Sequence, residues 1–219
     1  MTKRAPIALV TGFAPFGGET VNPSQLIAQE LDGQTIAGHG IVGATLPTAF
    51  ATSLVALREL LARHKPTLVL AVGQAGGRAG ISLERVAINL IDARIADNAG
   101  AQPVDIAVVE KAPNAYFSTL PLKAMLAALR QAGIPAALSH SAGTFVCNQV
   151  FFGLAHVLQT RRKRVRGGFI HVPYLPEQAA RHGDAPSLPL AVMVEAVRLG
   201  LQIALTTPAD VHYAAGALS

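Results

Sequence analysis

The sequence is poor in several residue types, and each scarcity limits what the protein can be. One cysteine in 219 residues excludes an intrachain disulfide framework and is typical of a reducing compartment. Apolar stretches stay well short of the roughly 20 residues that a membrane-spanning helix needs. No C-x-x-C, H-E-x-x-H or comparable group of metal ligands occurs. We therefore expect a cytoplasmic protein with no membrane span, no metal and no other cofactor.

Charged residues are scarce as well, at 14% of the chain against a usual share of about 25%. Hydrophobic residues make up 51%, so little charge is available to cover a monomer's surface, and we expect a homo-oligomer. The formal net charge is +5, but the one dense basic run, at residues 161–164, has no interleaved aromatic residues. Basic residues in the last turn of a helix also interact favourably with its dipole. Nucleic acid is therefore not an expected partner.

Length and hydrophobic pattern favour one α/β domain spanning residues 1–219. Short apolar runs predict buried strands, and apolar residues at helical spacing predict helices between them. The predicted strands are residues 7–10, 41–46, 68–72, 84–90, 134–138 and 167–174. The predicted helices are residues 22–31, 50–64, 116–129, 144–158 and 188–205, and the third of them is expected to be broken early by Pro121. Residues 92–104 are expected to form a long excursion with little regular structure. This order implies a largely parallel sheet, with functional sites beyond the carboxyl ends of its strands.

Two glycine-rich turns follow predicted strands. Residues 12–18 contain Phe13 and Phe16, which is unusual because loops seldom expose aromatic side chains without an apolar ligand or partner. Binding of such a ligand and packing of the loop on its own core both fit this pattern. Residues 73–80 resemble a phosphate cradle in composition, but their spacing is neither G-x-G-x-x-G nor that of a P-loop. Phosphate binding therefore has weak support.

Cys147 lies where a turn of small residues passes into a predicted helix. Thr144 is a candidate N-cap, which places Cys147 in the first helical turn. The positive end of the helix dipole would there stabilise a thiolate and lower the pKa of the thiol. A thiolate attacks carbonyl groups, so this position suits a nucleophile. The alternative is that Cys147 is a small buried hydrophobic residue.

A cysteine nucleophile needs a base and a group that orients the base. His171 is the best candidate base, because it lies near a predicted strand end within an apolar segment. A core histidine is the alternative, and His140 and His156 compete because they are close to the cysteine in sequence. Glu84 is a candidate acid that follows the second glycine-rich turn. An ordinary ion pair of Glu84 with Arg85 explains it equally well.

Five segments of the chain resemble the pyroglutamyl peptidase I family of cysteine peptidases, also called pyrrolidone-carboxylate peptidases. They are Thr11-Gly-Phe-Ala-Pro-Phe-Gly-Gly with Asn22-Pro-Ser, Val72-Gly-Gln-Ala-Gly-Gly-Arg, Glu84-Arg-Val-Ala-Ile-Asn, Ser141-Ala-Gly-Thr-Phe-Val-Cys-Asn and Gly168-Phe-Ile-His-Val-Pro. They occur in the family's order from residue 7 to about residue 178. Together they are highly specific.

The resemblance implies a fold, an activity and a set of site residues. The fold is a single-domain α/β/α sandwich with a twisted, largely parallel, mixed sheet. The activity is hydrolysis of the amide bond after an N-terminal pyroglutamate of a peptide, through a thioester and without a metal, in a tetramer or dimer. The implied catalytic triad is Glu84, Cys147 and His171. The implied pyroglutamate pocket consists of Phe13, Phe16, Gln74, Ile95, Phe145 and Val146, with Arg94 near the catalytic centre.

One departure from the family pattern concerns the loop that carries Arg94 and Ile95. Ala96 stands where relatives often have proline in Arg-Ile-Pro-Asp-Asn, so we expect a less rigid loop there. Two other functional classes remain open at this stage. A nucleoside-phosphorylase-like transferase would use a glycine-rich rim to bind phosphate and would not need Cys147. A binding module without catalysis would show no turnover.

Overall fold

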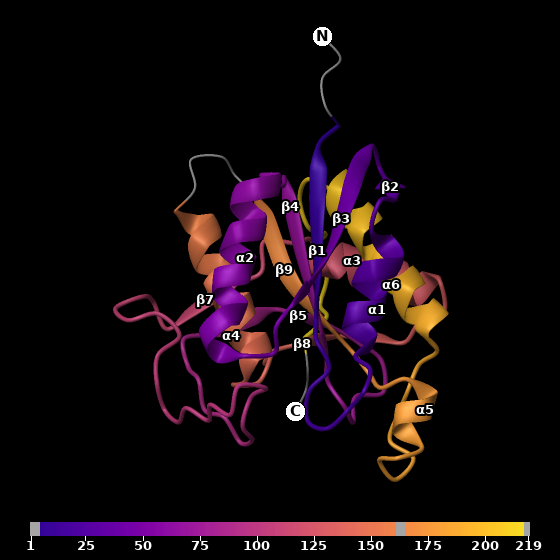
Figure 1. Ribbon diagram of the computed structural model, residues 1–219. Helices are drawn as coiled ribbons and strands as arrows, with labels where there is room; N and C mark the ends of the chain where they lie inside the picture. Colours follow the sequence, from indigo (N-terminus) through magenta and orange to yellow (C-terminus); the bar gives the residue numbers. More distant parts are fainter. Residues whose placement is uncertain (1–4, 161–164, 217–219) are drawn as a thin grey trace.

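A seven-stranded sheet forms the centre of the molecule (Figure 1). The structure is a computed structural model that describes residues 5–160 and 165–216, so the basic run at 161–164 lies outside the described residues. The strands of this sheet, in spatial order, are β2 (Thr35–Ile36), β3 (His39–Leu46), β1 (Ile7–Phe13), β4 (Leu68–Gln74), β9 (Arg166–Val172), β5 (Ile81–Glu84) and β8 (Ala136–Ser139).

Most neighbouring strands of the sheet run parallel, as predicted. The exceptions are β2 with β3 and β5 with β9, which pair antiparallel. Strand β4 is buried along its whole length, because helices cover both of its faces. A second, two-stranded antiparallel sheet consists of β6 (Val86–Ile88) and β7 (Ala115–Phe117). The fold is thus an α/β fold with a mixed, mostly parallel sheet.

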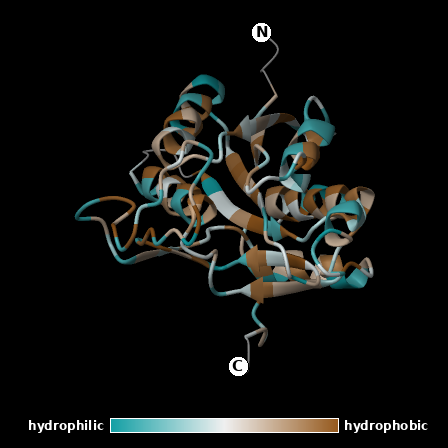
Figure 2. Ribbon diagram, turned by 60° about the horizontal axis from the view of Figure 1, so that its bottom comes forward, coloured by the Kyte–Doolittle hydropathy of each residue, from teal (hydrophilic) through white to brown (hydrophobic). Residues whose placement is uncertain are grey.

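Helices lie on both faces of the main sheet and complete an α/β/α sandwich. The helices are α1 (Pro23–Leu31), α2 (Phe50–His64), α3 (Leu122–Gln131), α4 (Val146–Gln159), α5 (Pro176–Ala179) and α6 (Leu190–Thr206). One hydrophobic cluster joins α1, α3 and α6 to the sheet, and the other joins α2 and α4 to its opposite face. Figure 2 shows helices with hydrophobic and hydrophilic sides around strands that are mostly hydrophobic or neutral. The amphipathic periodicity of the sequence therefore predicted the places of most of these helices in the chain correctly.

Two predicted elements differ from the structure. The helix predicted at 116–129 begins only at Leu122, directly after the break predicted at Pro121, and residues 115–117 form the strand β7 instead of a first helical turn. The strand predicted at 84–90 is two short strands in different sheets, since β5 ends at Glu84 and β6 begins at Val86. Between them, the N–H of Arg85 donates to the backbone oxygen of Ser139 at 2.8 Å. The pattern also missed the four-residue helix α5.

The excursion predicted at 92–104 is confirmed, because these residues contain no helix or strand. An isolated bridge between Ile91 and Ile106 closes the segment at its base. The segment lies near the carboxyl ends of β1, β4 and β9, at the lower side of Figure 1, together with the start of α4. The long loop and the catalytic cysteine predicted from the sequence thus meet at the same edge of the sheet.

Candidate active site

The N-terminus of α4 positions the cysteine. Helix α4 begins at Val146, and Phe145 forms its N-cap with an extended backbone and no side-chain hydrogen bond. Cys147 is therefore in the first turn, as predicted. The cap predicted at Thr144 is wrong, because this hydroxyl donates to the backbone oxygen of Asp92 at 2.7 Å. Thr144 ties two loops together and leaves the first-turn N–H groups of α4 without a side-chain cap.

A glycine on β4 makes space for the thiol beside His171. Strands β4 and β9 are parallel, and their register places His171 opposite Gly73. A Cβ atom at Gly73 would lie 2.8 Å from Sγ of Cys147 and 2.8 Å from Cζ of Phe169, closer than side chains tolerate. The absence of a side chain at Gly73 therefore lets α4 bring the thiol to the carboxyl ends of these strands.

Glu84 reaches His171 from the neighbouring antiparallel strand. The register of β5 and β9 pairs Glu84 with Phe169 and Ser82 with His171. Glu84 and His171 are therefore diagonal neighbours on one face of the sheet. Nδ1 of His171 lies 2.7 Å from Oε1 of Glu84, and Glu84 is fully buried. The three residues of the predicted triad thus come from β5, β9 and α4.

The cation that pairs with Glu84 is Arg78 rather than the Arg85 considered from the sequence. Nη1 of Arg78 donates to Oε1 of Glu84 at 2.6 Å, and Nη2 donates to the backbone oxygen of Ser141 at 2.9 Å. Oε2 of Glu84 is buried and has no hydrogen-bond partner among the described residues. A buried carboxylate requires such compensation, so Arg78 and His171 together stabilise its charge. Arg78 was not among the site residues predicted from the sequence, although its place at the end of a glycine-rich turn was a usable signal.

Burial and charge set the protonation states of these groups. Burial raises the pKa of Glu84, but the hydrogen bond and charge of His171, with the charge of Arg78, hold that pKa below its usual value. Burial lowers the pKa of His171, against the opposing effect of Glu84. Burial, reinforced by the charge of Glu84, raises the pKa of Cys147 to about 12. A helix N-terminus contributes about 0.3–1 kcal/mol, less than one pKa unit, so the lowered thiol pKa predicted from the sequence is wrong.

These states fix the tautomer of the imidazole. An ionised carboxylate only accepts hydrogen bonds, so Nδ1 of neutral His171 carries the proton and Nε2 keeps its lone pair. Cys147 and His171 line the same cavity, although no hydrogen bond joins them in the described part of the chain. Such a contact often tightens only when substrate is bound. The arrangement suits a base that takes the thiol proton during attack.

The cavity beside these side chains has a volume of about 300 Å³. Five predicted substrate-binding residues line it, namely Phe16, Gln74, Arg94, Ile95 and Phe145. The other two do not. Phe13 is 1% exposed with its ring centroid 6.2 Å from that of Phe169, and Val146 is fully buried. Phe13 therefore packs in the core, as the alternative interpretation of this turn allowed.

An aromatic group forms one wall of the cavity. The ring centroid of Phe145 lies 6.1 Å from that of Phe16 and 5.1 Å from that of Phe50, which meets it edge-on. Asp97 holds the loop with Arg94 and Ile95 against this wall, since its carboxylate accepts the N–H of Phe50 at 2.7 Å. The loop is thus anchored at Asp97, one residue after Ala96, the position at which this chain lacks the proline that relatives often have.

The other candidate histidines lie elsewhere. The ring of His156 is hydrogen-bonded to the hydroxyl of Tyr116 at 2.9 Å, and His140 is exposed. Neither lines the cavity that contains Cys147. Of these histidines, only His171 is positioned to serve the thiol.

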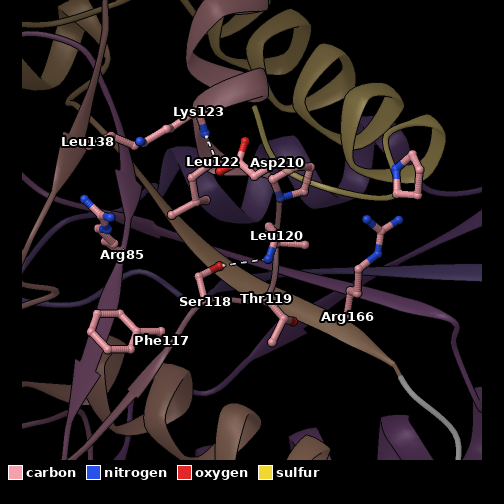
Figure 3. A pocket seen from close by; sticks show the side chains of 12 residues that line it. Arg85, Phe117, Ser118, Thr119, Leu120, Leu122, Lys123, Leu138, Arg166 and Asp210 are labelled. Carbon is pink, nitrogen blue, oxygen red and sulfur yellow. Dashed lines mark hydrogen bonds between the residues drawn. The ribbon is translucent and has the colours of Figure 1, made fainter. Parts of the chain in front are cut away.

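A second cavity, of about 310 Å³, is lined by a different set of side chains (Figure 3). Two of its charged side chains are engaged: Arg166 donates to the backbone oxygen of Thr207 at 2.7 Å, and Asp210 accepts the backbone N–H of Lys123 at 3.1 Å. No cysteine or histidine is among its lining residues. The two cavities are similar in size, and the chemistry of their walls identifies the first one as the candidate active site.

Comparison with known proteins agrees with this assignment. A sequence model described as "Pyroglutamyl peptidase" matches residues 7–207. The chain belongs to the pyroglutamyl peptidase family. A pyrrolidone-carboxylate peptidase of Cupriavidus taiwanensis is 55% identical over 214 residues, which cover 97% of this chain and 99% of the relative. One from Bacillus cereus is 47% identical over 209 residues, covering 95% and 97% of the two chains.

Solved structures of the pyroglutamyl peptidase family share the fold. The crystal structure of pyroglutamyl peptidase I from Bacillus amyloliquefaciens matches with a TM-score of 0.93 and 44% identity, covering 96% of this chain and 100% of the other. A mutant pyrrolidone carboxyl peptidase from Pyrococcus furiosus matches with a TM-score of 0.90 and 43% identity, covering 92% and 99%. The resemblance indicated by the sequence is therefore confirmed, and the protein is a cysteine-type peptidase of this family. Family membership decides against both the transferase and the binding module.

Within residues 5–160 and 165–216, no helix has the length and apolar character needed to cross a membrane. The same residues contain no group of three or more His, Cys, Asp or Glu side chains that could hold a metal ion.

Proposed function

We propose that this chain hydrolyses the amide bond after an N-terminal pyroglutamate, with Cys147, His171 and Glu84 as its catalytic triad. The observation that carries the proposal is the hydrogen bond of 2.7 Å between His171 and the buried Glu84, in a cavity that Cys147 also lines. This bond leaves one ring nitrogen as a base. Membership in the pyroglutamyl peptidase family supplies the substrate class.

The reaction begins with attack by the thiol on the carbonyl carbon that joins pyroglutamate to the next residue. Nε2 of His171 takes the proton from Sγ of Cys147 as the sulfur–carbon bond forms. The imidazolium that results is stabilised by the carboxylate of Glu84. The tetrahedral oxyanion accepts hydrogen bonds from backbone N–H groups in the uncapped first turn of α4.

The second half of the reaction returns the enzyme to its starting state. His171 gives its proton to the leaving amine, the carbon–nitrogen bond breaks, and a pyroglutamyl thioester remains on Cys147. His171 then removes a proton from a water molecule that attacks the thioester. Free pyroglutamate leaves, and the sulfur regains a proton from the imidazolium.

The walls of the cavity fit the pyroglutamyl ring. The lactam ring is flat and uncharged, and the faces of Phe16 and Phe145 can contact it without an ion pair. Ile95 adds an apolar side chain to the same cavity. An N-terminal glutamine or glutamate would bring a charged ammonium group against these apolar walls, at a desolvation cost that the cavity does not repay.

We also propose that residues 1–219 form one catalytic domain that assembles into a homotetramer or homodimer in the cytoplasm. The low charged fraction of 14% and the exposed side chain of Phe117, at 69%, support a subunit interface. A reducing compartment would keep the sole cysteine available as a thiol. Sedimentation equilibrium decides the oligomeric state: a monomer at micromolar concentration would contradict the assembly.

The proposed function is tested with three chromogenic amides that differ only in their N-terminal group, which is pyroglutamyl, glutaminyl or prolyl. We expect kcat/KM to be far higher for the pyroglutamyl amide than for the other two, and turnover to be lost after treatment with a thiol alkylator. Equal turnover of the glutaminyl amide would contradict the assignment of an uncharged pocket. Phosphate-dependent turnover would instead indicate transferase chemistry.

A further inference from the structure

Gln178 is a buried polar residue that the catalytic mechanism does not use. It lies in the short helix α5 and is fully buried. Its Oε1 accepts the backbone N–H of Leu175 at 3.1 Å, and its Nε2 lies 3.2 Å from the backbone oxygen of Val21. A backbone N–H can only donate and a backbone oxygen can only accept, so these two contacts allow one orientation of the Gln178 amide.

Glu19 reinforces that orientation. Oε2 of Glu19 accepts from Nε2 of Gln178 at 3.2 Å and from Arg181 at 2.7 Å, and Oε1 faces Nε2 of His182 at 2.7 Å. The hydrogen bond with His182, with help from Arg181 and Gln178, lowers the pKa of Glu19 to about 2. The carboxylate is therefore ionised at any working pH and presents only acceptors to Gln178.

The oriented amide of Gln178 in turn fixes Gln74. Nε2 of Gln178 also lies 3.1 Å from the side-chain oxygen of Gln74, at the end of β4, so its two N–H groups are shared among three acceptors. The reversed Gln74 amide would bring two N–H donors together in a buried place. Oε1 of Gln74 is thus turned to Gln178, and its Nε2 has no acceptor in the described part of the chain. Gln74 lines the active-site cavity and is 8% exposed.

We propose that Glu19 and Gln178 act as positioning residues that hold the amide of Gln74 with its N–H donors toward the active-site cavity. The cavity then selects a five-membered ring that carries an acceptor carbonyl, a lactam, over the pyrrolidine ring of an N-terminal proline. A pyrrolidine leaves these donors unpaired and adds a charged ring nitrogen. This inference rests on the proposed function, because it assigns the lactam carbonyl of the substrate ring as the acceptor that Gln74 binds.

Glu19, Gln178 and Gln74 thus form a hydrogen-bonded relay. Its direction can be reversed without changing its composition, by exchanging the two members farther from the cavity in the double variant Glu19→Gln with Gln178→Glu. The carboxylate at 178 would accept the N–H of Leu175 and the amide at 19, and Gln74 would reverse to donate to it. The backbone oxygen of Val21 would lose its donor, so the stability of this variant is measured with its kinetics. The cavity would then present an oxygen to the lactam carbonyl. We expect KM for the pyroglutamyl amide to rise about 5- to 150-fold, as for an unpaired polar group in a buried site.

Two readouts separate positioning from a general loss of structure. The alkylation rate of Cys147 and kcat should stay within about threefold of wild type, because the triad is untouched. The preference for pyroglutamyl over prolyl amides, as a ratio of kcat/KM, should fall with the rise in KM. Glu177→Gln is the matched control, since Glu177 is exposed on the same helix and should leave all values unchanged. A folded exchange variant with wild-type KM and preference would overturn the relay.

A second measurement tests the relay even if the double variant does not fold or the wild-type enzyme does not turn over the substrate. In wild-type protein, NMR hydrogen exchange should show protected side-chain amide protons for Gln178 and rapidly exchanging ones for Gln74. Glu19→Ala should accelerate exchange at Gln178. If wild type shows no turnover but has this exchange pattern, the proposed function fails and the relay stands. Protected Gln74 protons in the free enzyme would contradict the relay directly.

Discussion

Helices α1 and α4 differ in how their N-termini are capped. At α1, the side chain of Asn22 accepts the N–H of Ser24 at 3.0 Å, and Pro23 occupies the first turn. At α4, Phe145 is the N-cap and gives no side-chain hydrogen bond. A cap of the first kind stabilises a protein by about 1 kcal/mol. Helix α4 lacks that stabilisation, and its uncapped N–H groups are the ones that the proposed mechanism assigns to the oxyanion.

The difference shows how one local structure can serve stability or chemistry. The first turn of α1 is closed by buried polar groups, since Asn22 is 1% exposed and Ser24 fully buried. The first turn of α4 opens into the active-site cavity through Cys147. We therefore expect changes at α1 to alter the free energy of unfolding, and changes around the start of α4 to alter the rate of the reaction.

The largest effect should come from the nucleophile. Cys147→Ser should lower kcat for the pyroglutamyl amide by on the order of 10⁴ or more, because a hydroxyl is far less acidic than a thiol and this site provides only a histidine base. Steady-state kinetics measure the effect, and circular dichroism checks that the fold is kept. A variant with wild-type kcat would remove Cys147 from the mechanism.

A smaller loss should follow from Glu84→Gln. The amide keeps the size of the side chain but loses the charge that stabilises the imidazolium of His171. The corresponding change in a serine-protease triad costs about 10⁴ in kcat, and a more acidic cysteine nucleophile should reduce this to on the order of 10 to 10³.

The matched control for this variant is Glu195→Gln. It removes an exposed ion pair with Arg198, whose closest atoms are 2.6 Å apart, and should leave kcat unchanged. If Glu84→Gln only lowers the melting temperature and keeps kcat, Glu84 has a structural role alone.

Crowding the thiol should also slow the reaction. In Gly73→Ala, the new Cβ would lie 2.8 Å from Sγ of Cys147, so the sulfur or the neighbouring ring of Phe169 must move. A displacement near 1 Å can cost about 10² in rate. The control is Gly40→Ala on β3, where an added Cβ would meet open space. Equal kcat values for the two variants would show that the position of the thiol does not depend on Gly73.

The pH dependence reports the state of the base. His171 must be neutral to accept a proton, so kcat/KM should fall as the pH drops through its pKa in the free enzyme. Burial lowers this pKa from the ordinary value of 6.5, so activity should persist below pH 6.5 before it is lost. A pH profile of kcat/KM measures the midpoint. A midpoint above 6.5 would mean that the charge of Glu84 outweighs the burial of the ring.

The smallest kinetic effect should come from the cap of α1. Asn22→Ala removes the hydrogen bond to the N–H of Ser24 and should lower the free energy of unfolding by about 1 kcal/mol. We expect kcat to stay within about twofold of wild type. Urea denaturation and steady-state kinetics check both quantities. A loss of kcat without a loss of stability would show that the start of α1 contributes to the reaction rather than to stability.

Much of the fold could be predicted from the sequence, because continuous apolar runs and helical periodicity depend on nearby residues. The strands β1, β3 and β4 and the helices α1 and α2 are examples, whereas the two-residue strand β2 was not predicted. The short strands β5 and β7, of four and three residues, were not predicted, because their partners are distant in sequence. Tertiary pairing rather than local pattern defines such elements.

Some residues of the candidate site could likewise be predicted from local sequence patterns, and others depend on tertiary packing. Cys147 at a helix start and His171 near a strand end follow from local patterns. Phe13 and Phe16 look alike in sequence, yet only the packing of the turn on Phe169 buries Phe13 and leaves Phe16 in the cavity. The partnership of Arg78 with Glu84 depends on how a loop folds back over β5, which no periodicity encodes.

Complete alkylation of Cys147, the only cysteine in the sequence, is the most direct test of its role as the nucleophile. The protein is treated with iodoacetamide until mass spectrometry shows full modification of Cys147, and turnover of the pyroglutamyl amide is then measured. We expect activity to fall in proportion to the modified fraction and to reach zero at full modification, and free pyroglutamate to slow the modification. Undiminished turnover by fully alkylated protein would contradict the assignment of Cys147 as the nucleophile.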